Sequence, residues 1–326
     1  MSAVEDPATT IIRLLQKNVN ITKEDSSAAY LLVSRSFGEH EMLKDYDGQI
    51  TVNLVEALDA KLELSSRVRR RIFQLRVSCW SVDKAGNSDS GALLRHKMVE
   101  EVNRVIRQNR KKPNETIYTF HDISSPSSLH KAFTCEAASD PAPSSEQWTE
   151  VSSANYQKLW LSDDQRLQSG SADYTPFMLF KFKIDPHEKY VNKLTLSFEG
   201  YGTSPFGNGV SIKVWNHMAS GWQQTQTHTG SGDATLTITL TSNCTDYVDS
   251  SGYVYLLART VYSGNGELPG ALCHCDFVKL AVEVEGISFI DVASCRLLDL
   301  KEFKPVVYCA EFSLKGWMLE YVSEST

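Results

Sequence analysis

The last forty or so residues of the chain can fold stably only with a partner that lies far away in the sequence. Around the Lys304-Pro305 break they predict two strands. In the second strand, odd positions from Val307 to Ser313 would face one side and even positions the other, which is the period of a strand. An isolated pair of strands is only marginally stable in water. The pair therefore has to join a sheet built from an earlier part of the chain.

The N-terminal part of the chain predicts such a sheet, with helices on one side of it. Asp6 followed by Pro7 is a favourable helix start, and a short helix is predicted from there to Asn18. Strands are predicted over residues 29–37 and 49–58. In the second range apolar and polar side chains alternate, which is the period of a strand.

Residues 67–113 extend this sheet and add a second helix. Over residues 71–83 apolar and polar side chains alternate, which predicts a long edge or ribbon strand. Apolar residues then recur at helical spacing over residues 94–106, so a helix of about five turns is predicted to end at Asn109. The order of elements is helix, three strands, helix. This sheet is incomplete, and it is the host that we expect for the C-terminal strands.

The composition changes at Ser124, where Ser, Pro, Ala and Asp become frequent and helix signals end. Strand-like segments then follow at regular intervals between turns rich in Gly, Asn and Ser, over residues 177–184, 193–199, 210–215, 234–240, 253–259 and 275–285. This spacing predicts an antiparallel sandwich of jelly-roll type. The predicted core residues are Phe180, Phe182, Leu194, Leu196, Phe198, Val214, Leu236, Ile238, Val254, Leu256 and Phe277.

We therefore predict an α+β chain in which one domain interrupts another. Residues 1–120 and 286–326 form a discontinuous α+β domain, and residues 121–285 form the inserted β-sandwich. Such an insertion is feasible because the two ends of a sandwich can lie close together at its surface.

Positive charge is concentrated next to the long strand. Residues 67–112 contain thirteen Lys and Arg against four Asp and Glu, in a chain whose net charge is -7. This basic stretch is either a solvated face or a surface that meets acid on a neighbouring subunit or on nucleic acid. The predicted subunit contact would pair four arginines with three nearby acids, and these residues are Arg67, Arg69, Arg70, Arg71, Glu56, Asp59 and Glu63.

Sequence motifs of catalysis are absent, and no enzyme activity, metal site or cofactor is predicted. The chain contains no GxSxG, HExxH, P-loop or GxGxxG sequence. The seven cysteines include Cys273 and Cys275 on either side of His274, but on a strand the histidine would point away from the two thiols. No apolar run approaches the roughly 20 residues of a membrane-spanning helix. Because the N-terminus carries acid where a signal peptide carries base, no Sec-type export is expected.

The sequence offers one group of candidate ligand-binding residues, Trp215, Asn216 and Trp222. Aromatic faces stack on sugar rings, and a nearby amide can supply hydrogen bonds, so a glycan is the predicted ligand. Trp222 follows the Ser220-Gly221 turn and is the first choice as a platform. Trp215, on its strand, is the more easily explained as a core residue.

The outer domain resembles the tail-terminator or tail-completion proteins of tailed phages and tailed archaeal viruses. The residues that carry this resemblance are the segments DPATTIIRLLQKN, QITVNLVEAL, RRRIFQLRVSCWSVD, GALLRHKMVEEVNRVIRQN, FKPVVYCAEF and SLKGWMLEYV. The resemblance implies a homo-oligomeric ring, commonly a hexamer, that contacts the tail tube and the neck or connector proteins. It also implies a location in the tail or neck of a virion assembled in the host cytoplasm. In that location the basic strand and helix would face either packaged DNA or a neighbouring subunit. The inserted part resembles galactose-binding-like, carbohydrate-binding sandwiches.

Three functions follow from these patterns. The first is a structural ring protein of a virion with a surface-exposed sandwich for decoration or glycan attachment. The second is a carbohydrate-binding or adhesion module that is not part of a ring. The third is a nucleic-acid-contacting factor that uses the basic strand and helix, although the sequence pI near 5.7 disfavours general affinity for nucleic acid.

Overall fold

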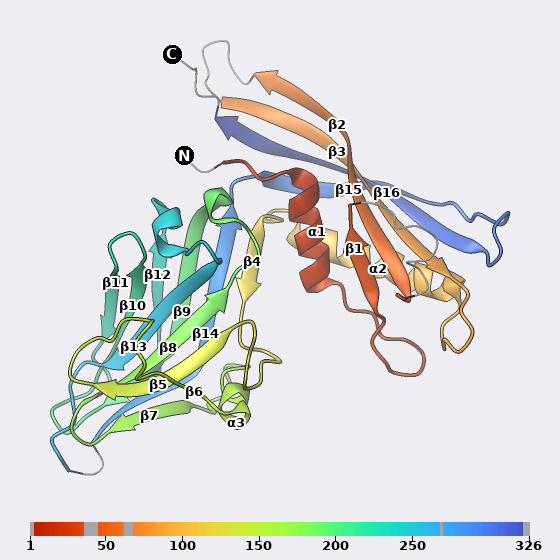
Figure 1. Ribbon diagram of the computed structural model, residues 1–326. Coiled ribbons are helices and arrows are strands. Elements are labelled where there is room, and N and C mark those ends of the chain that lie inside the picture. The colour runs from red at the N-terminus through yellow and green to blue at the C-terminus, as the bar shows by residue number, and fades with distance from the viewer. Residues whose placement is uncertain (1–2, 36–44, 62–67, 268–269, 322–326) are drawn as a thin grey trace. The chain divides into compact units, whose positions relative to one another are not determined.

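The computed structural model describes residues 3–35, 45–61, 68–267 and 270–321 (Figure 1). The chain separates into two compact units. The sandwich unit comprises Glu115–Val284, and the α+β unit comprises Val4–Asn114 together with the segment that begins at Glu285. Each unit has a hydrophobic core of its own.

The α+β unit is built on a five-stranded sheet. Its strands, in spatial order, are β1 (Leu31–Ser34), β2 (Gly48–Lys61), β3 (Val68–Val82), β16 (Val307–Tyr321) and β15 (Ile287–Leu297). Only the pair of β1 and β2 is parallel. β16 pairs with the whole length of β3, from Val307 opposite Val82 to Tyr321 opposite Val68. This confirms that the C-terminal strands complete the N-terminal sheet. It also shows that the prediction of β3 as an edge strand was wrong, because β16 occupies that edge.

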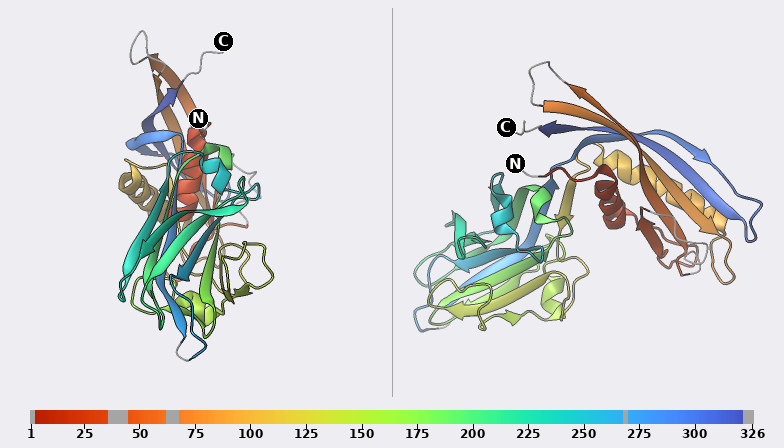
Figure 2. Two further views of the ribbon diagram at one scale, coloured as in Figure 1. Left: turned by 90° about the vertical axis from the view of Figure 1, so that its left-hand side faces the viewer. Right: turned by 45° about the horizontal axis from the view of Figure 1, so that its top comes forward.

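Two helices cover one face of this sheet (Figure 2). α1 (Pro7–Asn18) starts at Asp6, whose carboxylate accepts a hydrogen bond from the Thr9 amide at 3.1 Å. α2 (Gly91–Asn109) starts at Ser90, whose hydroxyl accepts one from the Leu93 amide at 3.2 Å. The predicted inner face of α2 is buried against the sheet, as are the alternating apolar residues of β3. These confirmed residues are Leu94, Met98, Val102, Phe73, Leu75, Val77 and Cys79.

The sandwich unit consists of two antiparallel sheets in a jelly-roll arrangement. One sheet has the order β11 (Gly221–His228), β10 (Val210–Asn216), β13 (Tyr253–Thr260), β8 (Thr175–Lys183), β5 (Lys131–Ala137) and β6 (Thr149–Glu150). The other has the order β12 (Ala234–Leu240), β9 (Val191–Thr203), β14 (Ala271–Val284) and β4 (Glu115–Tyr118), with β7 (Leu167–Ser171) pairing with β14. The short helices α3 (Ser153–Gln157), η2 (Glu188–Tyr190) and η3 (Cys244–Tyr247) lie in the connections.

The core of the sandwich contains the predicted residues with one exception. Phe277 does not join the buried cluster, although the ten other predicted residues do. The reason is an irregularity in β14, where the pairing with β9 shifts between Cys275 and Phe277. Asp276 is the extra residue, so the alternation is displaced by one position and Phe277 turns outward while Val278 enters the core.

Within the described residues, none of the helices has both the length and the apolar composition that crossing a membrane requires.

Candidate functional site

The outward face of the six-stranded sheet carries three aromatic side chains in a line, which we call the aromatic row: Trp222, Trp215 and Tyr255. On β10 the alternate residues Val210, Ile212 and Val214 point into the core, so Trp215 points outward. Trp215 pairs in register with Trp222 of β11, and their rings are 5.1 Å apart at 73°. Val214 pairs with Leu256, which places Trp215 beside Tyr255 on β13. All three side chains of the row are half-buried.

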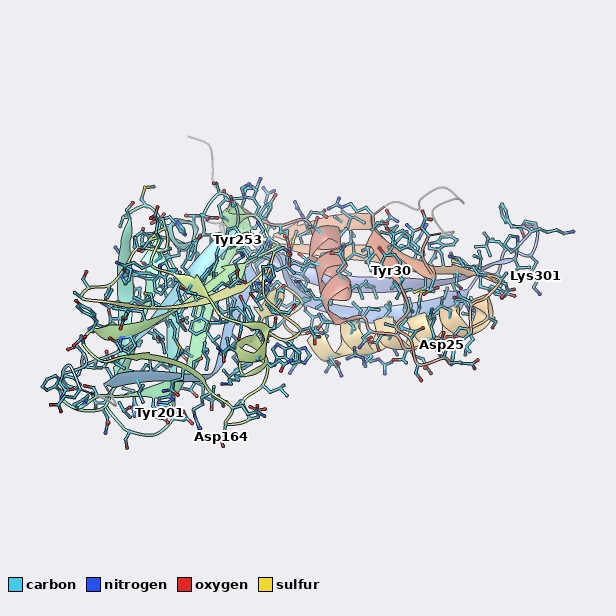
Figure 3. All side chains as sticks on the ribbon, turned by 60° about the horizontal axis from the view of Figure 1, so that its bottom comes forward. Asp25, Tyr30, Asp164, Tyr201, Tyr253 and Lys301 are labelled. Atoms are coloured by element: carbon cyan, nitrogen blue, oxygen red, sulfur yellow. The ribbon has the colours of Figure 1, made fainter. Side chains whose placement is uncertain are left out.

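Lysines continue this line across the sheet. Tyr255 is in register with Lys181 of β8, and Lys181 is in register with Lys131 of β5. The ammonium of Lys181 lies 3.8 Å from the ring centroid of Tyr253, and that of Lys183 lies 4.9 Å from the same centroid. Figure 3 labels Tyr253 on this side of the sandwich unit. The row and the lysines form one surface in which cations lie next to aromatic faces.

His217 closes one side of the row. Its ring lies 5.5 Å from that of Tyr255, and its Nε2 atom is buried without a hydrogen-bond partner among the described residues. Burial lowers the pKa of His217, and burial raises the pKa of Tyr255 to about 12. Both groups are therefore uncharged at neutral pH.

A loop before β6 covers the other half of this face. Asp140 forms ion pairs with Lys213 and with Arg259, the latter at 2.8 Å. The indole nitrogen of Trp222 donates a hydrogen bond to the carbonyl oxygen of Pro141 at 2.8 Å. Three outward-facing apolar residues are buried there, outside the sandwich core: Phe177, Leu179 and Leu257. The loop thus fixes Trp222 and leaves the aromatic row at the edge of the covered area.

The three predicted glycan contacts do not lie together. Trp215 and Trp222 are in contact, and both are half-buried on the outward face. The sequence had predicted a different position for each: Trp215 in the core and Trp222 on an exposed turn. Asn216 points to the opposite side and is 6% exposed. Its side-chain oxygen accepts from the Ala219 amide at 2.7 Å, and its nitrogen donates to Gln223 at 3.1 Å. Asn216 therefore shapes the turn before β11, and both atoms of its amide have partners within the chain.

The other sheet carries a second group of polar residues on its outward face. Tyr201 stacks on His274 at 4.4 Å between ring centroids, and Figure 3 shows Tyr201 on the side opposite Tyr253. Asp276 is 2% exposed, its Oδ1 has no hydrogen-bond partner among the described residues, and burial raises the pKa of its carboxyl group. No three metal-ligating side chains of the described residues gather into a group that could hold a metal ion. Cys273 and Cys275 are buried in the core, on the side away from His274.

Four of the predicted subunit-contact residues lie on the described parts of β2 and β3: Glu56, Arg69, Arg70 and Arg71. Arg67, Glu63 and the side chain of Asp59 fall outside what the structure describes. Arg71 is in register with Asp59 of the same chain, and the guanidinium of Arg70 lies 4.9 Å from the ring centroid of Trp317. Arg69 is half-buried and Glu56 is exposed. β16 thus provides Arg70 with an aromatic partner within the chain, and the contact between subunits stays a prediction.

The prediction from sequence did not include the tyrosines and lysines of this face, although their strands show an alternation that could have identified them. Tyr253 and Tyr255 alternate with the buried Val254 and Leu256 along one strand, and Lys181 and Lys183 alternate with buried phenylalanines along another. This period of two places the tyrosines and lysines on the outward face. The pairing of β13 with β8 places the tyrosines next to the lysines, and no sequence pattern indicates that pairing.

Comparisons with known proteins concern the sandwich unit. A family model described as "Uncharacterized protein, C-terminal domain" matches residues 127–284. A solved xylan-binding module, CBM15, is 10% identical over 52% of this chain and 97% of its own, with a TM-score of 0.29. A low-affinity xylan-binding module, CBM86 from Roseburia intestinalis, is 12% identical over 52% of this chain and 95% of its own, with a TM-score of 0.25. The carbohydrate-binding module CBM6cm-2 from Cellvibrio mixtus lichenase 5A is 10% identical over 52% of this chain and 97% of its own, with a TM-score of 0.23.

No curated protein matches the chain. Nothing in these comparisons shows the tail-terminator family. The TM-scores are too low for the solved structures to bear on ligand or function, so these have to be inferred from the side chains of the aromatic row and its surroundings.

Proposed function

We propose that the sandwich unit is a carbohydrate-binding module and that a glycan chain lies along the aromatic row. The observation that supports this most directly is the position of Trp222, Trp215 and Tyr255 on three adjacent strands, facing away from the core. At a strand spacing of about 4.8 Å the row is about 10 Å long, enough to contact more than one sugar ring. His217 supplies a polar group beside it. The proposed role is binding and not catalysis.

A glycan array with the full-length chain, followed by calorimetric titration of the best ligand, tests this proposal. Trp215→Ala removes the central ring, and we expect at least a tenfold weaker Kd, since losing about 1.4 kcal/mol of binding free energy has that effect. Trp160→Ala is the matched control, because Trp160 is half-buried in the same unit but follows α3, away from the row. Unchanged affinity in Trp215→Ala, or an array without any bound glycan, would rule the proposal out.

As a second function, we propose that the α+β unit associates with further copies of itself, as the resemblance to ring-forming tail proteins implies. The uncovered face of its sheet exposes Leu58 and Ile72, which are in register with each other and are 58% and 43% exposed. The exposed Glu56 and the half-buried Arg69 nearby give this region both signs of charge, so a second copy can offer complementary groups. The location in a virion and the tail-tube and neck partners rest on that resemblance.

Sedimentation velocity of the full-length chain at micromolar concentration tests self-association. We expect a closed oligomer, and we expect Ile72→Asp to convert it to monomers, because the substitution puts a carboxylate into an apolar contact. His96→Asp is the control, since it adds the same carboxylate on an exposed position of α2. A wild-type protein that is monomeric at micromolar concentration contradicts this second function and leaves the glycan proposal intact.

A further inference from the structure

Lys181, in the middle of the outward face, has no carboxylate within ion-pair distance among the residues that the structure describes. Within the described residues, the nearby cations have oxygen partners: Lys131 pairs with Glu150 at 3.1 Å, and Lys183 donates to the carbonyl oxygen of Ser251. Among the described residues, the ammonium of Lys181 has no hydrogen-bond or ion-pair partner, and it lies 3.8 Å from the ring centroid of Tyr253 and 5.5 Å from that of Tyr255. A half-buried ammonium in such a position lacks the charge-assisted hydrogen bonds that a carboxylate or sulfate could supply.

The charges around Lys181 make this position more favourable for an incoming anion. Lys131 is in register with it, and Lys183 lies two residues further along the same strand. Burial lowers the pKa of Lys181, and the two neighbouring lysines lower it further, while Asp249 acts in the opposite sense. A bound anion would offset both the loss of hydration and the repulsion among the lysines.

The acids near this position are already engaged. Glu150 is bonded to Lys131, to the hydroxyl of Tyr156 at 3.0 Å and to the amide of Ser127 at 2.9 Å. One carboxylate oxygen of Asp249 accepts from the amides of Ser251 and Tyr253, at 2.9 and 2.8 Å. These bonds fix both carboxylates within the fold. Neither lies within ion-pair distance of the Lys181 ammonium.

The position of Lys181 relative to the aromatic row determines which part of a ligand it would meet. Lys181 is opposite Tyr255 in register, so a sugar ring stacked on Tyr255 would direct a substituent toward the ammonium. On the other side of Tyr255, the buried Nε2 of His217 has no partner within the described part of the chain. One sugar ring placed at Tyr255 would thus lie between a cation and the uncharged side chain of His217.

We infer that the ligand of the aromatic row is an acidic glycan, whose carboxylate or sulfate group binds Lys181 while its sugar ring stacks on Tyr255. This inference rests on the proposed glycan-binding function and specifies the class of its ligand. Uronic acids and sulfated sugars share the anionic group that Lys181 requires, and the experiment distinguishes the two.

Calorimetric titration of the full-length chain with matched pairs of oligosaccharides tests the inference. The first pair is an oligogalacturonate and its fully methyl-esterified form, and the second is a carrageenan oligosaccharide and its desulfated form. We expect the anionic member of one pair to bind at least tenfold more tightly than its neutral partner, and the pair that shows the difference identifies the anion. We also expect the preference to shrink as the salt concentration rises, because ions screen a half-exposed charge pair.

Two lysine variants assign the preference to a residue. Lys181→Gln should bring the anionic and neutral members of the pair to within about twofold of each other, while the thermal midpoint of unfolding stays unchanged. Lys189→Gln should keep the full preference, since Lys189 lies 4.8 Å from the ring centroid of Tyr190 in the same type of contact but in η2. Equal affinity for both members, or a preference that survives in Lys181→Gln, overturns the inference and leaves glycan binding standing. Absence of binding to any saccharide overturns the proposed function and the inference together.

Discussion

Val102→Asp should unfold the α+β unit. Val102 lies in the middle of α2 and is 0% exposed, in contact with the cluster that fills the space between the helices and the sheet. Burying a carboxylate there without a partner costs several kcal/mol, which is a large part of the 5–15 kcal/mol by which a typical domain is stable. Because the sandwich unit has a separate core, we expect its fold to persist.

Hydrogen exchange followed by mass spectrometry can resolve the two units in the intact chain. In Val102→Asp the amides of residues 4–114 and 285–321 should lose protection, while those of residues 115–284 keep it. Gln108→Asp is the matched control, because it places the same side chain on the exposed side of α2, within reach of Arg104. Val102→Ala should be folded but less stable by about 1–3 kcal/mol, as a truncated core side chain is. Full protection in Val102→Asp would mean that α2 packs through a different face.

Periodicity within a single segment was sufficient to predict the elements whose two faces differ strongly. In α2 the buried apolar residues lie on one side, and β3 alternates from Phe73 to Cys79. The side of each element that faces the core could therefore be predicted. The same applies to the Cys273 and Cys275 pair, whose buried thiols and outward His274 follow from the period of a strand. In these cases the local pattern and the final packing agree.

Strands whose two faces do not differ clearly in polarity were not predicted. β11 is an edge strand with polar residues on both faces, so it shows no apolar alternation. β5 lies in the Ser- and Pro-rich stretch that begins at Ser124, and β7 has a single apolar residue in its sequence LQSGS. The misplacement of Trp215 was avoidable. If Val214 is a core residue, strand geometry places Trp215 outside the core.

The candidate site depends on pairing between strands, which a single sequence does not specify. Trp215, Tyr255 and Lys181 come from three strands separated by turns and by whole elements. Each side chain can be assigned to an outward face from its own strand. Their arrangement in one line requires the order β10-β13-β8 and the register of those strands, which arise from the packing of the complete jelly roll.

Arg13→Met should destabilise the α+β unit by about 3–5 kcal/mol, the usual cost of leaving one partner of a buried ion pair behind. Arg13 and Glu5 are 6% and 2% exposed, and two hydrogen bonds of 2.7 and 2.6 Å join the guanidinium to both carboxylate oxygens. The hydroxyl of Thr10 donates to the same carboxylate at 2.7 Å. Without Arg13, that hydroxyl is the only one of these donors left to the buried negative charge.

Urea unfolding of a set of variants distinguishes an unpaired charge from a simple loss of contacts. Arg104→Met is the control, since Arg104 pairs with Glu101 at 2.6 Å but is exposed, and such surface pairs contribute about 1 kcal/mol or less. The double variant Glu5→Gln with Arg13→Met removes both charges, while the amide oxygen can still accept the bond from Thr10. It should therefore be more stable than Arg13→Met alone, because the cost of the single substitution comes from the carboxylate that stays buried. If the double variant is no more stable than the single one, or if Arg13→Met costs no more than Arg104→Met, the ion pair is not what holds the start of α1.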